Sequence, residues 1–194
     1  VVRGVKRAHV VVDMPFGSYQ SGEADALHSA IRIMKETGAD SLKIEGGVEV
    51  VPSIKKIIDA GIPVMGHIGL MPQSINKYGT YALRANNEEE ARKLRSDAKA
   101  LEEAGCYAIV IEKVPAVLAA EVAKSVSIPI IGIGAGSGAD GQVLVMHDML
   151  GINMDFSPKF LRRYANLNQV ISEAVVNYIN DVKSGDFPNE NEQY

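Results

Sequence analysis

The sequence contains a single cysteine, Cys106, among its 194 residues. One cysteine excludes an internal disulfide and is typical of a reducing compartment, so we expect a cytoplasmic protein. The sequence also lacks any cluster of cysteine and histidine that would suggest a zinc site. If the protein holds a metal ion, its ligands are therefore of another kind.

Neither a large excess of one charge nor a long apolar run is present. The formal net charge is −4, which gives no support for binding to nucleic acid or to a membrane surface. The longest apolar runs, such as residues 128–133, are far too short to span a bilayer. Apolar residues make up 46% and charged residues 23%, as in an ordinary globular protein. The length allows one domain with a substantial core.

The first residues, Val1-Val2-Arg3-Gly4, include no initiator methionine and no signal peptide. An apolar run at residues 8–12 follows almost at once. We therefore expect the chain to enter its fold in the middle rather than at a natural beginning.

Short apolar segments that are typical of β-strands recur along the chain. Most are almost continuously apolar, as expected for parallel strands that are covered on both faces. The predicted strands are residues 8–13, 41–45, 63–67, 107–112, 128–134 and, as a sixth candidate, 142–146.

Helical segments alternate with these strands. The predicted helices are residues 23–37, 48–60, 88–104 and 114–126, with one more amphipathic helix at about 169–183. Three of them end at a glycine that leads into the next strand: Gly38, Gly61 and Gly105. A glycine C-cap followed by a strand is the repeating joint of βα architecture.

Six strands of this kind predict either an open doubly wound sheet or most of a (β/α)₈ TIM barrel. A full barrel takes about 250 residues, so the chain is short by roughly 56 residues, or about two βα units. Together with the abrupt start, this favours a barrel that lacks its first two βα units. No linker or low-complexity segment divides the chain, so we expect one N-terminally incomplete barrel domain over residues 1–194, with a frayed tail at 185–194.

Polar side chains stand at the ends of four successive predicted strands: Asp13, Lys43 with Glu45, His67, and Glu112. Taken singly, each has an ordinary structural explanation. Asp13 lies two residues before Pro15 and could form a turn, and Lys43 and Glu45 could form an internal ion pair. Glu112 could cap the following helix, and His67 could be a hydrogen-bonded histidine of the core. Because the carboxyl ends of parallel barrel strands converge on one mouth, a single site explains all four better than four separate coincidences.

The chemistry of this set suits a divalent metal and a carbonyl substrate. Asp13 and Glu45 are hard oxygen ligands of the kind that Mg²⁺ takes together with water and substrate oxygens. Lys43 suits an anionic group such as a carboxylate, and His67 suits donation to a carbonyl oxygen. Glu112 remains as an acid or base. A metal ion chelated by a 2-oxo acid stabilises an enolate, which points to carbon–carbon chemistry next to a carbonyl.

Two loops lie beside these strand ends. Residues 71–87 form a long βα loop with polar groups such as Gln73, and such loops often serve as lids or substrate sites. An irregular surface excursion explains the length equally well. Residues 132–138 are rich in glycine, but their spacing is a poor dinucleotide fingerprint and no matching acidic residue follows. We expect them to form a loop at the barrel mouth where a ligand can lie near the backbone.

At these residues the chain resembles the ketopantoate hydroxymethyltransferase (3-methyl-2-oxobutanoate hydroxymethyltransferase) family. The similarity extends in order over essentially the whole chain. The matching segments are residues 13–16, 43–47, 66–74, 111–115, 128–136, 140–148 and 158–160. The strings Gly-His-Ile-Gly-Leu-Met-Pro-Gln-Ser and Asp-Gly-Gln-Val-Leu-Val-Met-His-Asp are long enough to make chance a poor explanation.

The resemblance implies a Mg²⁺-dependent (β/α)₈ barrel of the phosphoenolpyruvate/pyruvate type that forms a homo-oligomer, a decamer in this family. It also implies hydroxymethyl transfer from 5,10-methylenetetrahydrofolate to 3-methyl-2-oxobutanoate, giving 2-dehydropantoate in the first committed step of pantothenate biosynthesis. By this resemblance Asp13 binds both Mg²⁺ and the substrate, and Glu45 binds Mg²⁺. Lys43 holds the substrate carboxylate, His67 lies near substrate oxygens, and Glu112 is the catalytic proton acceptor.

In one respect the chain departs from the family pattern. The family has an earlier Gly-Asp-Ser strand end, whose aspartate is a further metal ligand and whose serine touches the substrate, and no such segment occurs here. A barrel without two of its strands exposes two sheet edges. We therefore expect the functional protein to contain the missing segment.

Two other interpretations stay open at this point. One is a different enzyme of the same superfamily that acts on a 2-oxo acid or on phosphoenolpyruvate. Such an enzyme would need a basic phosphate site or a reactive loop cysteine, and Cys106 lies at the start of a predicted strand, the wrong end of a barrel. The second is a non-catalytic fragment that serves as a scaffold or an oligomer subunit. The presence of the other site residues speaks against it, and the missing metal ligand keeps it open.

Overall fold

The computed structural model describes all 194 residues, which form two compact units, residues 1–143 and residues 144–194. Each unit is described by itself. The single barrel domain expected over residues 1–194 stays a prediction, and so does the frayed tail.

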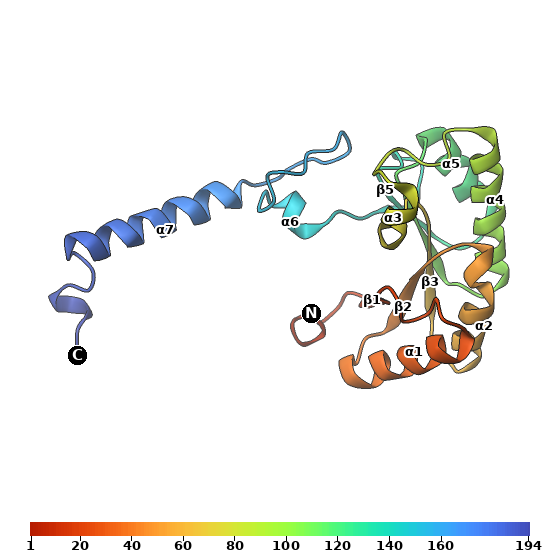
Figure 1. The fold of residues 1–194 in the computed structure, drawn as a ribbon, viewed down its shortest axis with the longest axis horizontal. Helices are drawn as coiled ribbons and strands as arrows, with labels where there is room; N and C mark the ends of the chain where they lie inside the picture. Colours follow the sequence, from red (N-terminus) through yellow and green to blue (C-terminus); the bar gives the residue numbers. More distant parts are fainter. The chain divides into compact units, whose positions relative to one another are not determined.

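The first unit is built on a parallel sheet of six strands (Figure 1). The strands are β1 (Val11–Asp13), β2 (Ser41–Glu45), β3 (Val64–Gly69), β4 (Ala108–Glu112), β5 (Ile130–Ile133) and β6 (Gly141–Gln142). They lie side by side in sequence order, and every neighbouring pair is parallel. A doubly wound sheet reverses its order at a switch point, whereas a barrel does not. The predicted barrel type is therefore confirmed, as a six-stranded partial barrel.

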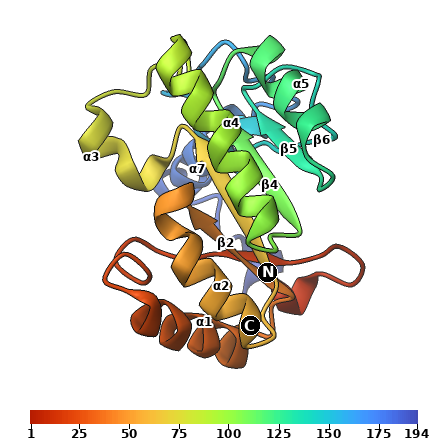
Figure 2. The ribbon, with the colours of Figure 1, turned by 90° about the vertical axis from the view of Figure 1, so that its right-hand side faces the viewer.

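Helices follow the strands at the positions that the apolar spacing predicted. They are α1 (Glu23–Thr37), the single turn η2 (Val48–Val50) with α2 (Val51–Asp59), α4 (Glu88–Glu103) and α5 (Ala116–Ser125). All four α-helices lie on one face of the sheet (Figure 2). Right-handed crossovers between parallel strands in sequence order bring each helix to the same face, which leaves the other face for the inside of the barrel.

The core lies between the sheet and these helices. Because side chains alternate along a strand, Leu42 and Ile44 of β2 face the helices and are fully buried. Their neighbours from the other strands and helices are also fully buried: Val64, Ile109, Ile111, Ile130, Ile54, Ile57 and Leu101. The intervening residues of each strand face the inside of the barrel, and the polar strand ends are among them.

The predicted loop of residues 71–87 contains two short helices, η3 (Pro72–Ser74) and α3 (Ile75–Tyr78). A further single turn, η1 (Val2–Gly4), precedes β1. No helix of the protein is both long and apolar enough to cross a membrane.

The sixth predicted strand, residues 142–146, is mostly wrong. Pairing with β5 covers only Gly141 and Gln142, and one more backbone bond joins Val143 N–H to Gly132 C=O at 3.0 Å. Because β6 is the last strand of the sheet, no further strand pairs with it. Met146 instead begins the one-turn helix α6 (Met146–Met149).

The second unit contains α6, α7 (Leu167–Ser184) and the short turn η4 (Glu190–Glu192). Helix α7 agrees with the amphipathic helix predicted near residues 169–183. Its exposed apolar residues include Val170, Ile171, Val175, Tyr178, Ile179 and Val182. Within the same unit, the ring of Tyr178 lies edge-on to the ring of Phe187, with centroids 5.5 Å apart.

Candidate active site

The strand pairing brings the predicted site residues to one end of the sheet. Asp13 is the last residue of β1 and stands beside Lys43. Glu45 is the last residue of β2 and stands beside His67. Glu112 is the last residue of β4 and stands beside Gly69. All five predicted residues are therefore neighbours at the carboxyl end of the strands, although their individual roles stay predictions.

Four of these side chains form an unbroken row of polar contacts. Lys43 Nζ lies 3.0 Å from Asp13 Oδ1 and 3.1 Å from His67 Nδ1. On the far side of the imidazole, His67 Nε2 lies 3.3 Å from Glu112 Oε2. The row crosses β1, β2, β3 and β4 in order, so the strand order of the barrel is also the order of the polar groups.

The hydrogen bond from Lys43 determines the tautomer of His67. An ammonium group only donates, so Nδ1 accepts and the proton of a neutral imidazole is on Nε2. Nε2 makes no hydrogen bond, because its approach to Glu112 lacks hydrogen-bond geometry, and the side chain is only 4% exposed. Buried donors are rarely left unpaired. This N–H is therefore available to an acceptor atom of a ligand.

Glu45 is a deeply buried carboxylate whose side chain is 3% exposed. Its Oε2 accepts a hydrogen bond from the backbone N–H of Gln73 at 3.0 Å, and its Oε1 lies 3.7 Å from His67 Nδ1. Burial raises the pKa of Glu45 above its ordinary value, and the nearby Asp13 adds to the rise. The charge that His67 carries when it is protonated, the hydrogen bond from the Gln73 N–H and the Lys43 ammonium oppose this rise in pKa. A carboxylate held this way gains from any cation that comes close.

One residue of the site was not predicted from the sequence. The Tyr19 side chain is 3% exposed and its hydroxyl contacts both the backbone of Glu45 and the side chain of Gln73. Burial raises the pKa of this phenol well above its usual range, and the Glu45 charge adds to the rise. Tyr19 lies in the loop after β1, where no periodic pattern exists, so only its closeness in sequence to the Asp13 strand end was a signal.

The donor set was compared with the predicted Mg²⁺ site. No three His, Cys, Asp or Glu side chains converge as metal ligands. Asp13 and Glu45 nevertheless lie on either side of Lys43 and His67, and Asp13 is close enough to affect the pKa of Glu45. Mg²⁺ is usually bound by one or two carboxylates, and water and substrate oxygens complete its coordination shell. It does not need a site made of protein ligands alone. The residues present therefore fit such an ion.

The loop of residues 71–87 is attached to the strand ends on both sides. Near its start, Gln73 bonds to Glu45. Near its end, Arg84 N–H donates to Lys113 C=O at 2.9 Å, and Lys113 Nζ donates to Tyr81 C=O. Lys113 directly follows Glu112 and has a left-handed backbone with φ of 51°. Such a conformation costs a side-chain-bearing residue about 1–3 kcal/mol and persists only where surrounding contacts hold it.

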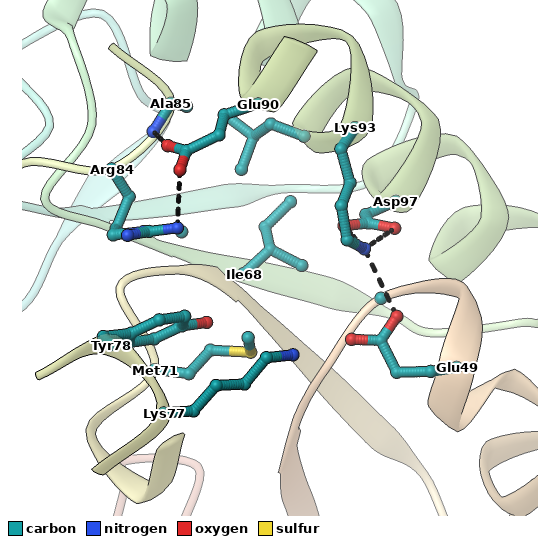
Figure 3. A pocket seen from close by; sticks show the side chains of 13 residues that line it. Glu49, Ile68, Met71, Lys77, Tyr78, Arg84, Ala85, Glu90, Lys93 and Asp97 are labelled. Carbon is teal, nitrogen blue, oxygen red and sulfur yellow. Dashed lines mark hydrogen bonds and ion pairs between the residues drawn. The ribbon is translucent and has the colours of Figure 1, made fainter. Parts of the chain in front are cut away.

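A cavity of about 390 Å³ lies between this loop and α4 (Figure 3). Its floor includes Ile68, whose side chain points away from the face that carries His67. Most charged groups around it are paired with one another: Arg84 with Glu90, and Lys93 with both Asp97 and Glu49. These pairs attach the loop and the turn η2 to α4 around the cavity.

The glycine-rich segment, residues 132–138, packs closely against α5. A Cβ on Gly136 would lie 2.4 Å from the Ala116 Cβ, and one on Gly138 would lie 2.5 Å from the Ala120 Cβ. In the structure the close partner of this loop is a helix. The approach of a ligand to its backbone stays a prediction. Cys106 lies two residues before β4 and is buried, and this burial raises the pKa of its thiol to about 12. A thiol of this kind is a poor nucleophile.

Comparison with known proteins gives consistent results. The family model described as ketopantoate hydroxymethyltransferase matches residues 1–190. The 3-methyl-2-oxobutanoate hydroxymethyltransferases of Phocaeicola vulgatus and Bacteroides thetaiotaomicron are 65% and 66% identical to the chain over 194 residues. Each alignment covers 100% of this chain and 71% of the relative. Among solved structures, N-acetylneuraminate lyase from Mycoplasma synoviae aligns with 64% of this chain and 45% of its own, with a TM-score of 0.46 and 13% identity.

Proposed function

The chain belongs to the ketopantoate hydroxymethyltransferase family, and we propose that it transfers a hydroxymethyl group from 5,10-methylenetetrahydrofolate to 3-methyl-2-oxobutanoate. The product is 2-dehydropantoate, and the step is the first committed one in pantothenate biosynthesis. The observation that carries the proposal is the row of contacts from Asp13 through Lys43 and His67 to Glu112. It joins an anion-binding group, a free donor and a base along four adjacent strand ends.

Lys43 is the group that receives the substrate carboxylate. Its ammonium has three N–H donors, of which one points to Asp13 and one to His67. The third is free for an anionic group. Because the Lys43 side chain is 18% exposed, a carboxylate bound there is largely shielded from water and the attraction is stronger than on the surface.

His67 and Glu112 act on the reacting end of the substrate. The Nε2–H of His67 donates to the substrate oxygen, where negative charge develops once the neighbouring carbon loses its proton. Glu112 Oε2, 3.3 Å from that nitrogen, removes the proton from C3. A donor and a base held on adjacent strands reach the oxygen and the C3 proton of one small molecule together.

Asp13 and Glu45 would hold Mg²⁺, which supplies further stabilisation of negative charge on the substrate when it is bound. The raised pKa of Glu45 means that burial opposes its charged form, and a divalent cation removes that opposition. Metal binding and ionisation of Glu45 therefore favour each other.

The location and the assembly follow from the same proposal. We place the enzyme in the cytoplasm, in line with its one buried, unpaired cysteine. We propose a homo-oligomer, a decamer by resemblance to the family, whose mass light scattering on the full-length protein measures.

The test is product formation by the full-length protein with Mg²⁺, 5,10-methylenetetrahydrofolate and 3-methyl-2-oxobutanoate. Glu112→Gln keeps the shape of the side chain and removes the base, so the rate should fall about 10²- to 10⁴-fold. Glu121→Gln is the matched control, because Glu121 lies on α5 and pairs only with Arg95. Turnover of other 2-oxo acids alone would support the related superfamily enzyme, and inactivity of the wild type toward all of them would support the non-catalytic interpretation.

A further inference from the structure

The backbone hydrogen bonds between β1 and β2 end beside the predicted metal ligands, and side chains replace the next bond of the ladder. The last backbone bond runs from Met14 N–H to Lys43 C=O at 3.0 Å. In a regular parallel ladder the next bond would run back from Glu45 N–H to Met14 C=O. Here Glu45 N–H donates to the Tyr19 hydroxyl at 3.3 Å, and Met14 C=O accepts from Gln73 Nε2 at 2.9 Å.

Tyr19 and Gln73 join these two backbone groups through their side chains. A phenol has one hydrogen to donate, and the shorter of its two contacts is with Gln73 Oε1 at 2.9 Å, against 3.2 Å to Glu45 C=O. The bonds therefore run from Glu45 N–H to the Tyr19 oxygen, from the Tyr19 hydrogen to the Gln73 amide, and from that amide to Met14 C=O. We call this arrangement the Tyr19–Gln73 bridge.

The bridge replaces one direct backbone bond with three bonds in series, so two side chains rather than the backbone ladder join the ends of β1 and β2 there. Met14 is fully buried and Tyr19 is 3% exposed, so both backbone groups depend on the bridge rather than on water. Gln73 also donates its backbone N–H to Glu45 Oε2. Gln73 thus orients the Glu45 carboxylate and also holds the backbone of Met14, the residue after Asp13.

We propose that Tyr19 and Gln73 are positioning residues that set the separation and orientation of the Asp13 and Glu45 carboxylates, and through them the affinity for a divalent cation. This inference rests on the proposed function, since it takes both carboxylates as metal ligands. Neither residue needs to contact the metal or the substrate. Groups that orient a metal ligand typically change metal affinity or activity about 10- to 100-fold when removed.

The test measures Mn²⁺ binding to the full-length protein by electron paramagnetic resonance, with no substrate present. Tyr19→Phe removes only the hydroxyl and should raise the dissociation constant for Mn²⁺ about 10- to 100-fold. Tyr107→Phe is the matched control. It removes a hydroxyl that bonds to Ser41 Oγ at 2.8 Å, at the opposite end of β2, and should leave the constant unchanged within about twofold.

Gln73→Met provides a second variant, because it keeps the length of the side chain and the backbone N–H while removing the amide. It should weaken Mn²⁺ binding in the same direction, and it carries the test if Tyr19→Phe does not fold. If the wild type binds Mn²⁺ and the folded variants bind it with the same dissociation constant, the inference is overturned and the proposed function stands. A wild-type protein that neither binds Mn²⁺ nor forms product would overturn the proposed function, and the inference with it.

Discussion

Gly69 lies where β3 passes closest to the predicted base, and its replacement by alanine is a sharp test of the site geometry. Its φ is +93°, and a Cβ there would lie 2.3 Å from the carbonyl oxygen of Glu112. That oxygen accepts a hydrogen bond from Leu70 N–H at 2.8 Å, so it is held in place from the same side. Gly69→Ala therefore pushes directly on the backbone of the base.

The size of the effect follows from two contributions. A carbon and a carbonyl oxygen normally stay about 3.3 Å apart, so one of them must move by roughly 1 Å. Breaking the Leu70 bond in this movement costs about 1–3 kcal/mol, and a positive φ costs a residue with a side chain about 1–3 kcal/mol more. The free energy of unfolding should fall by about 2–6 kcal/mol in total. A displacement of the base by about 1 Å should also slow the reaction roughly 100-fold.

Gly61 supplies the matched control, because its φ is +87° and a Cβ there would meet nothing within 4 Å. Gly61→Ala should cost only the backbone contribution of about 1–3 kcal/mol and leave the rate of the folded protein unchanged. Urea unfolding gives the stability of both variants, and product formation gives the rate. If Gly69→Ala were as stable and as active as Gly61→Ala, the contact between Gly69 and the Glu112 backbone would not hold the base.

Two further predictions concern buried ionisable groups. Because burial raises the pKa of Glu45, the native protein binds a proton at a pH where the unfolded chain has released it, so its stability falls as the pH rises through that interval. Glu45→Gln in metal-free buffer should therefore be more stable than wild type at pH 8, and this gain in stability should shrink toward pH 4. Urea midpoints that show the opposite trend would contradict a raised pKa for Glu45. Burial raises the pKa of Cys106 to about 12, so a thiol reagent at pH 8 should label it only after unfolding; rapid labelling of the native protein would refute its burial.

The gathering of the predicted site residues at one end of the sheet could be foreseen from the sequence because these residues interrupt apolar strands. Asp13, His67 and Glu112 each stand at or near the end of such a strand, and period two places Lys43 and Glu45 on the same face. Parallel pairing then brings these strand ends together independently of the conformation of the loops. The fold class followed from the same alternation of strands and helices, and the strand order in the structure decided between the two architectures that the sequence allowed.

The features that the sequence did not reveal depend on contacts between distant residues. Tyr19 meets residues 26 and 54 positions away, and a loop has no periodicity from which such contacts follow. Likewise, the tautomer of His67 depends on Lys43 in the neighbouring strand. The apolar residues Val143 and Val145 suit a strand by composition, but no further strand pairs beyond β6, so the chain turns into α6 instead.

The most direct test of the central claim is the exchange of the C3 proton of 3-methyl-2-oxobutanoate in deuterated water, followed by proton NMR with full-length protein and Mg²⁺ but without folate. This measurement isolates the step that the row from Asp13 to Glu112 is proposed to carry out. Wild-type protein should exchange the proton, Glu121→Gln should match it, and Glu112→Gln should be slower by about 10²- to 10⁴-fold. Exchange by Glu112→Gln at the wild-type rate, or no exchange by the wild type, would contradict the account.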